Sequence, residues 1–218
     1  MLDREDLDLL KNILSLHNDN INYDLLYNVL TATKDFEESK ADILDSFSSN
    51  QFKAKVTLLE HVEKLNVLTK EDDLVIFGSW YGSILIPKLA DKVKRITCID
   101  LDEKVLKIAK NRLFKDYENI EYRVGDIFAD DLKRYKETKL FINASCEHMK
   151  PMKEFKWFEP NSYFAFTSND MDYIEGHINC VHSLDEFKSQ LPENSEVLFE
   201  EEVEDTRGIR YMLVGNFL

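Results

Sequence analysis

Side chains suited to chemistry gather in one run of the sequence, Asn143-Ala144-Ser145-Cys146-Glu147-His148-Met149, which directly follows an apolar segment. An asparagine amide can hold a substrate amine or hydroxyl, and a nearby glutamate or histidine can remove its proton. We therefore interpret Asn143 as a substrate-binding residue and Glu147 or His148 as the general base. The structural alternative is that Ser145 and Glu147 cap a helix while His148 makes a hydrogen bond within the protein.

A second polar segment follows the next apolar strand and contains Asn169 and His177, which we expect to face the same site. The two segments together hold five potential soft metal ligands: Cys146, His148, His177, Cys180 and His182. No pair of them has the short spacing typical of a zinc site, so the sequence predicts no metal. Cys146 near His148 also suggests a thiol nucleophile, but an isolated pair of this kind is more typical of packing.

A tight turn is predicted at Gly78-Ser79-Trp80-Tyr81-Gly82, between an apolar strand and a helical pattern. Glycine has no Cβ atom, so Gly78 and Gly82 let the backbone approach a ligand closely. The alternative is an ordinary strand-to-helix turn in which Trp80 packs against the core.

Two acidic residues stand at the ends of later strands. Asp100 ends an apolar strand about twenty residues after the glycine turn, where a carboxylate can accept both hydroxyls of a ribose. Asp102 lies two residues further and is expected to cap the following helix. Asp126 follows Gly125 at the end of the next strand, and its alternative interpretation is an ordinary Gly-Asp turn.

The segments that must position these residues alternate between short apolar strands and amphipathic helices after residue 70. Strands are predicted at 74–77, 95–100, 120–124, 139–143, 163–167, 196–204 and 209–217, and helices at 83–90 and 103–114. Such apolar runs are typical of a parallel sheet covered on both faces, and the aromatic run 163–166 is interpreted as core. A hairpin-like turn at 205–208 predicts that the last two strands pair antiparallel.

The first 70 residues show no strand-like run and are predicted to form two or three helices, with apolar residues at helical spacing in 7–14, 25–30 and 52–65. The polar and acidic stretch 35–50 holds little to bury and is predicted to be a mobile connection. We therefore divide the chain into a helical N-terminal extension, 1–70, which forms a lid or substrate wall, and an α/β domain, 71–218.

In order and spacing, the three turns and their sheet resemble the class I S-adenosylmethionine-dependent methyltransferases over roughly residues 70–217. The resemblance implies an α/β, Rossmann-like methyltransferase fold with a mostly parallel seven-stranded sheet and an antiparallel C-terminal strand. It implies S-adenosylmethionine as the cofactor and S-adenosylhomocysteine as the product. The cofactor-binding residues that it implies are Gly78, Trp80, Gly82, Asp100, Asp126 and Ile127.

By this resemblance Asp126 meets the adenine amino group and Ile127 packs on the adenine ring. Trp80 stands where the family usually has a middle glycine, and Ile76 where an acidic residue usually helps to fix the methionine amino group. Asn143 lacks the two prolines and the aromatic residue that often follow it in amino-group methyltransferases. This departure argues against a standard nucleobase or amide substrate.

Composition limits the partners. The formal charge of −14 and a pI near 4.8 argue against a general nucleic-acid binder and favour a small or cationic substrate. Three scattered cysteines predict no disulfide framework. No signal sequence or membrane span is recognised, so a cytoplasmic protein is expected.

These features favour a methyltransferase that acts on a small molecule or a protein side chain. The alternative is a catalytically silent methyltransferase-like module that binds a partner protein, suggested by Ile76 and Trp80 in the glycine turn. An NAD-dependent oxidoreductase would require a full glycine fingerprint, which the turn lacks. The sequence determines neither the methylated atom nor the oligomeric state.

Overall fold

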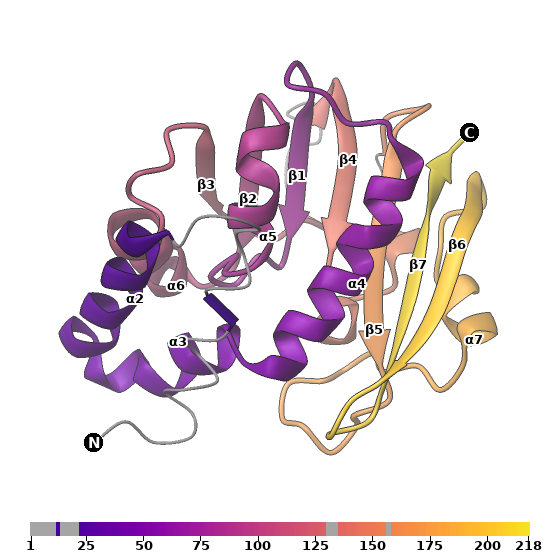
Figure 1. Ribbon diagram of the computed structural model, residues 1–218. Coiled ribbons are helices and arrows are strands. Elements are labelled where there is room, and N and C mark those ends of the chain that lie inside the picture. The colour runs from indigo at the N-terminus through magenta and orange to yellow at the C-terminus, as the bar shows by residue number, and fades with distance from the viewer. Residues whose placement is uncertain (1–11, 14–21, 130–134, 156–157) are drawn as a thin grey trace.

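Seven strands form one sheet, in the order β3-β2-β1-β4-β5-β7-β6, in the computed structural model (Figure 1). The structure describes residues 12–13, 22–129, 135–155 and 158–218. The strands are β1 Asp73–Phe77, β2 Arg95–Asp100, β3 Ile120–Val124, β4 Thr138–Asn143, β5 Tyr163–Asn169, β6 Ser195–Glu204 and β7 Ile209–Phe217. Neighbours among β1 to β5 pair in parallel, whereas β7 runs antiparallel to β5 and β6. The predicted sheet with its antiparallel C-terminal strand is confirmed.

The central strands β1, β4 and β5 are mostly apolar and buried because both faces of the sheet are covered there, whereas the edge strands β3 and β6 carry charged residues. Successive side chains of a strand point to opposite faces. In β1, Leu74 and Ile76 join one cluster of buried side chains, while Val75 and Phe77 join a second cluster across the sheet. Each face therefore has its own core.

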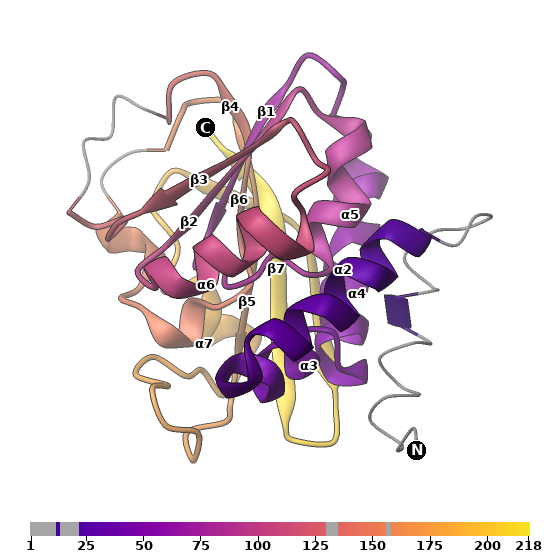
Figure 2. The same ribbon diagram turned by 90° about the vertical axis from the view of Figure 1, so that its left-hand side faces the viewer.

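Helices cover the two faces unequally. The α-helices are α2 Tyr23–Asp35, α3 Lys40–Ser46, α4 Ser49–Leu65, α5 Leu85–Leu89, α6 Glu103–Ile108 and α7 Leu184–Lys188, and a π-helical turn, Ala109–Leu113, continues α6. Figure 2 shows α2, α4 and α5 on one side of the sheet and α7 on the other. No helix in the described part of the chain is long and apolar enough to cross a membrane.

Aromatic side chains fill the face that has fewer helices. Phe164 and Phe166 of β5 are completely buried there, which confirms their interpretation as core. The rings of Phe158 and Phe217 stack with their centroids 4.0 Å apart. Large rings bury much apolar area per residue, so they replace the helices that would otherwise cover this face.

The helix α4 begins three residues before the apolar pattern at 52–65, because the side chain of Ser48 accepts a hydrogen bond from the backbone N–H of Gln51. It ends at Asn66, whose left-handed φ of +51° stops the helix. Figure 1 shows α4 lying across the sheet in front of β5 and β7. This position brings its first turns to the carboxyl ends of the parallel strands.

The prediction that 35–50 is a mobile connection is wrong. The segment folds into a 3-10 turn, Glu37–Ser39, and the helix α3. Its few apolar residues are spaced so that Ile43 and Phe47 are both completely buried. The number of apolar residues was therefore a poor guide, because two large side chains are enough to anchor a segment of this length to the core.

The helices before residue 70 pack on the sheet. The predicted helix at 7–14 lies outside the described residues except for Asn12 and Ile13. Buried side chains of α2, α3 and α4 join those of β1 and β2 in one cluster. The division of the chain near residue 70 stays a prediction, and the parts on either side of it share this core.

Replacing Ile43 by alanine tests whether α3 is anchored to the core. We expect Ile43→Ala to lower the free energy of unfolding by about 2–5 kcal/mol, because the lost methyl groups leave a cavity in a packed core. Leu30→Ala, at a position of α2 that is 47% exposed, should change it by less than about 0.5 kcal/mol. Urea unfolding of both variants measures the difference, and equal small effects would show that α3 is not anchored.

Candidate active site

A cavity of about 420 Å³ opens at the carboxyl ends of the parallel strands. Open α/β sheets bind ligands at this edge, and the volume is within the usual range for small-molecule sites. Seven of the nine predicted site residues line it: Gly78, Trp80, Asp100, Asp126, Ile127, Glu147 and His148. Asn169 and His177, predicted to face the same site, also line it, whereas Asn143 and Gly82 do not.

The glycine turn wraps around the end of β1. Gly78 has a left-handed φ of +53°, and a Cβ atom there would lie 2.9 Å from Cε of Met149. Gly82 also has a left-handed φ, +71°, and its carbonyl accepts a hydrogen bond from Ile86 at the start of α5. Gly78 thus lets the backbone border the cavity, while Gly82 shapes the turn into the helix behind it.

Trp80 also adopts a left-handed conformation, with φ of +48°. This conformation costs a residue with a Cβ atom about 1 kcal/mol or more. The cost is a physical reason for the glycine that the class I methyltransferases usually have at this position of the turn. The Trp80 ring lies 5.3 Å from the ring of Tyr81, and Nζ of Lys55 lies 5.9 Å from its centroid. Trp80 therefore forms part of the cavity wall.

Asp100 stabilises the turn. One of its carboxylate oxygens accepts a hydrogen bond of 2.7 Å from the backbone N–H of Trp80, and the other accepts one of 3.0 Å from Asp102. A carboxylate has about four acceptor sites, so Asp100 keeps capacity for ligand hydroxyls. The side chain of Asp102 accepts hydrogen bonds from Lys104 and Val105. Its predicted role as the cap of α6 is confirmed.

Asp126 and Ile127 follow β3 at the other end of the cavity. The Asp126 carboxylate accepts a hydrogen bond of 2.9 Å from the backbone N–H of Phe128, which fixes the turn. Asp126 is exposed and able to receive a polar ligand group, whereas Ile127 is buried and offers an apolar surface. The pair can bind a flat ring with polar edges.

The interpretation of Asn143 as a substrate-binding residue needs correction. Asn143 is completely buried, and its side-chain oxygen accepts a hydrogen bond from the backbone N–H of Ser145. Its side-chain nitrogen contacts the sulfur atoms of Met149 and Met152 at 3.0 and 3.1 Å. All its polar atoms are thus engaged below the cavity, where Asn143 holds the turn after β4.

Glu147 is an acid in an apolar and cationic environment. Its side chain is only 4% exposed, and its Oε2 atom has no hydrogen-bond partner among the described residues. Burial raises the pKa of Glu147, while a backbone hydrogen bond and then the positive charges of Arg210 and Lys55 act in the opposite direction. A carboxylate with a raised pKa is a stronger base than an exposed one.

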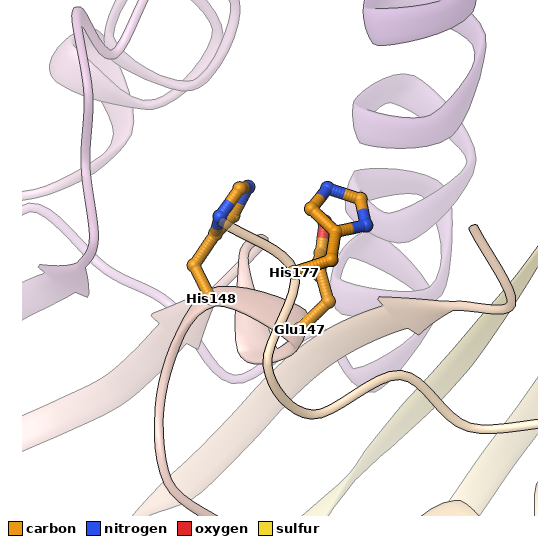
Figure 3. A group of neighbouring side chains, drawn as sticks. All are labelled: Glu147, His148 and His177. Carbon is orange, nitrogen blue, oxygen red and sulfur yellow. The ribbon is translucent and has the colours of Figure 1, made fainter. Parts of the chain in front are cut away.

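His148 and His177 lie beside Glu147, as Figure 3 shows. The two imidazole rings are perpendicular, with their centroids 4.5 Å apart. Burial, followed by the charge of His148, lowers the pKa of His177, so its neutral form is favoured. Cys146 is fully buried and burial raises its pKa well above the usual value, which excludes it as a thiolate nucleophile.

Three cationic residues of the cavity wall were missed by the sequence analysis: Lys55, Arg207 and Arg210. Lys55 comes from α4, and the two arginines come from the β6–β7 hairpin. The Nε and Nη2 atoms of Arg207 are buried without a hydrogen-bond partner among the described residues. No local pattern marks these residues, because only the packing of α4 and the reversed strand β7 brings them to the cavity.

Solved structures share this fold, although no protein-family model and no curated protein matches the sequence. N-methyltransferase NodS from Bradyrhizobium japonicum WM9 is 19% identical over 78% of this chain and 98% of its own, with a TM-score of 0.59. This chain has a methyltransferase fold. NodS in complex with S-adenosylhomocysteine matches 99% of both chains at 14% identity and a TM-score of 0.59. A geranyl diphosphate methyltransferase in complex with GPP and sinefungin matches 80% of this chain and 79% of its own at 11% identity and a TM-score of 0.59.

The burial of Lys55 predicts a pH-dependent stability. Burial, aided by the charge of Arg210, lowers the pKa of Lys55 from 10.5 to about 8, against the attraction of Asp45 and Glu147. Between these two values the unfolded chain binds more protons than the folded one, so the stability of the protein rises with pH across this window. Lys55→Met should remove this contribution, and it should stabilise the protein more at pH 7 than at pH 10.

Urea unfolding from pH 7 to 10.5 measures the effect. The matched control is Lys53→Met, two residues earlier on α4. The Lys53 side chain is exposed, and its Nζ donates a hydrogen bond to the carbonyl of Glu204. Its stability profile should run parallel to that of the unmodified protein. If the Lys55→Met profile were also parallel, the ammonium group of Lys55 would have to be solvated.

Proposed function

We propose that the protein is an S-adenosylmethionine-dependent methyltransferase that acts on a small molecule or a protein side chain and releases S-adenosylhomocysteine. One observation carries the proposal: the glycine turn after β1, Asp100 after β2 and Asp126 after β3 all line one cavity. The neighbours in fold include an N-methyltransferase with S-adenosylhomocysteine bound. The three turns stand at the strand ends that the resemblance assigns to the cofactor.

The proposed cofactor position follows from these side chains. Asp100 accepts the ribose hydroxyls, Asp126 meets the adenine amino group, and Ile127 packs on the adenine ring. The backbone at Gly78, free of a Cβ atom, borders the methionine portion. Ile76 is buried in the sheet, so the methionine amino group must be held by another residue or the cofactor binds weakly.

S-adenosylmethionine supplies a methyl carbon activated by the adjacent sulfonium. The nucleophilic atom of the substrate forms a bond to this carbon while the carbon–sulfur bond breaks, and the nucleophile then carries one proton too many unless a base removes it. Glu147 and His148 line the cavity beside the turn after β4 and are the proposed bases. Positioning, exclusion of water and this proton transfer are what the chain itself contributes.

The Arg207 guanidinium favours an anionic group on the substrate, because its Nε and Nη2 atoms are buried without a hydrogen-bond partner among the described residues. The net charge of −14 favours a cationic substrate, but the cavity wall holds Lys55, Arg207 and Arg210 as well as four carboxylates. Asp45 lies 3.6 Å from Nη1 of Arg207 and engages only that end of the guanidinium. An acceptor compound with a carboxylate should therefore be methylated faster than its amide analogue, and this preference should shrink in Arg207→Gln.

Cofactor binding tests the proposal. We expect Asp100→Asn to weaken the binding of S-adenosylhomocysteine about tenfold to hundredfold, because hydrogen bonds to a charged group contribute about 1.5–3 kcal/mol. Asp102→Asn is the matched control, since Asp102 caps α6 and does not line the cavity. Isothermal titration calorimetry measures both.

The titration also decides between the two candidate functions. Saturable binding that depends on Asp100 supports the methyltransferase. If the unmodified protein bound neither S-adenosylmethionine nor S-adenosylhomocysteine at millimolar concentration, the silent module that binds a partner protein would be the better interpretation.

A further inference from the structure

Three side chains with metal-binding atoms meet at the wall of the cavity. Figure 3 shows Glu147 and His148, adjacent in the sequence, beside His177 from the loop after β5. One ligand atom from each residue can be chosen so that all three lie within 4.8 Å of one another. Two imidazoles and one carboxylate are a ligand set that suits divalent transition metals.

The buried carboxylate of Glu147 points to a missing partner. Its Oε2 atom is buried and accepts no hydrogen bond from the described residues. A buried charged oxygen without a partner is costly, and such atoms in folded proteins are usually paired or bound to a metal. Because Glu147 also lines the cavity, a cation that binds there can reach it from the open side.

The surroundings of the two histidines are those of metal ligands. Nδ1 of His148 lies 3.1 Å from the carbonyl oxygen of Gly176. Donation of the Nδ1 proton to this carbonyl leaves the Nε2 lone pair of His148 free, and a hydrogen bond of this kind commonly orients metal-binding histidines. Nδ1 of His177 lies 3.6 Å from Sγ of Cys180.

The two segments that carry the ligands are joined by backbone hydrogen bonds. The carbonyl of Glu147 accepts hydrogen bonds from the N–H groups of Ile178 and Asn179, at 2.8 and 3.0 Å. These bonds fix the turn after β4 against the loop after β5. The three side chains are therefore brought together by the fold and not by chance contacts of exposed residues.

We propose that Glu147, His148 and His177 form a binding site for a divalent transition metal of the Zn²⁺ class, with its open coordination positions facing the cavity. Tetrahedral ligands about 2.0 Å from Zn²⁺ lie about 3.3 Å apart. The ligand atoms lie within 4.8 Å of one another, so the exposed His148 and the half-buried His177 side chains must turn toward each other when the metal binds. No short metal-binding pattern marks this site in the sequence, because His177 lies 29 residues after His148.

The site also indicates a substrate class, an inference that rests on the proposed function. A divalent metal lowers the pKa of a hydroxyl group that it binds. A substrate with a hydroxyl as the methyl acceptor would then lose its proton to water in the cavity near neutral pH, and its oxygen would form the bond to the methyl carbon as the carbon–sulfur bond breaks. Glu147 and His148 would in that case hold the metal in place of acting as bases.

Titration of the tag-free full chain with Co²⁺, in the absence of S-adenosylmethionine, tests the site by visible absorption and calorimetry. We expect one Co²⁺ per chain, with ligand-field absorption that Zn²⁺ abolishes and Mg²⁺ does not. Changes in second-shell groups weaken metal binding 10- to 100-fold, so His148→Ala and His177→Ala should weaken it by more than about 100-fold. Equal Co²⁺ affinity in the unmodified protein and in these variants, or displacement by Mg²⁺, would overturn the proposal.

His182→Ala is the matched control and should leave Co²⁺ binding unchanged. His182 is an exposed histidine of the same loop, and its Nε2 atom lies 3.2 Å from the Asp172 carboxylate. His148 is exposed, so its replacement should leave the fold intact, which thermal unfolding verifies. Binding of S-adenosylhomocysteine is measured on the same samples. If the unmodified protein binds S-adenosylhomocysteine but no Co²⁺, the metal site is wrong; if it binds Co²⁺ but no S-adenosylhomocysteine, the proposed function is wrong.

Discussion

Parallel pairing of β1 with β2 and β4 is the constraint on which the rest of the structure depends. Parallel strands that share a register end at the same edge of the sheet, so the residues that follow them must meet. Phe77, the last residue of β1, pairs with Ile99 and Asn143 in the neighbouring strands. The glycine turn, Asp100 and the turn after β4 are neighbours for this reason, although the chain separates them by 20 to 65 residues.

A second constraint is the reversed direction of β7. Because β7 runs antiparallel to β5, its first residues lie at the carboxyl edge of the parallel strands, where Arg210 pairs with Asn169. Nε of Arg210 contacts the carboxylate of Asp205 at 2.9 Å, and both side chains are almost fully buried. The reversed strand thus brings a guanidinium, paired with Asp205, to the cavity of a protein whose net charge is −14. Net charge describes the whole surface and is a poor guide to one site.

Several features of the cavity oppose stability. Trp80 holds a strained backbone conformation, the ammonium of Lys55 is buried, and Oε2 of Glu147 has no hydrogen-bond partner in the part of the chain that the structure describes. Each costs free energy that the two cores must offset. Such features persist where the surrounding fold imposes them, and their concentration in one cavity is typical of a functional site.

The sequence by itself determined the strands and the order of the turns that border the cavity, since these depend on local periodicity and on turn residues such as Gly78 and Asp102. The tertiary structure alone decided which distant segments meet. It placed Lys55 of α4 beside Trp80 and His177 beside His148, and it withdrew Asn143 below the cavity. The physical reason is that helix packing and loop contacts arise from side chains far apart in the chain, whose encounters leave no periodic or short-range signal in the sequence.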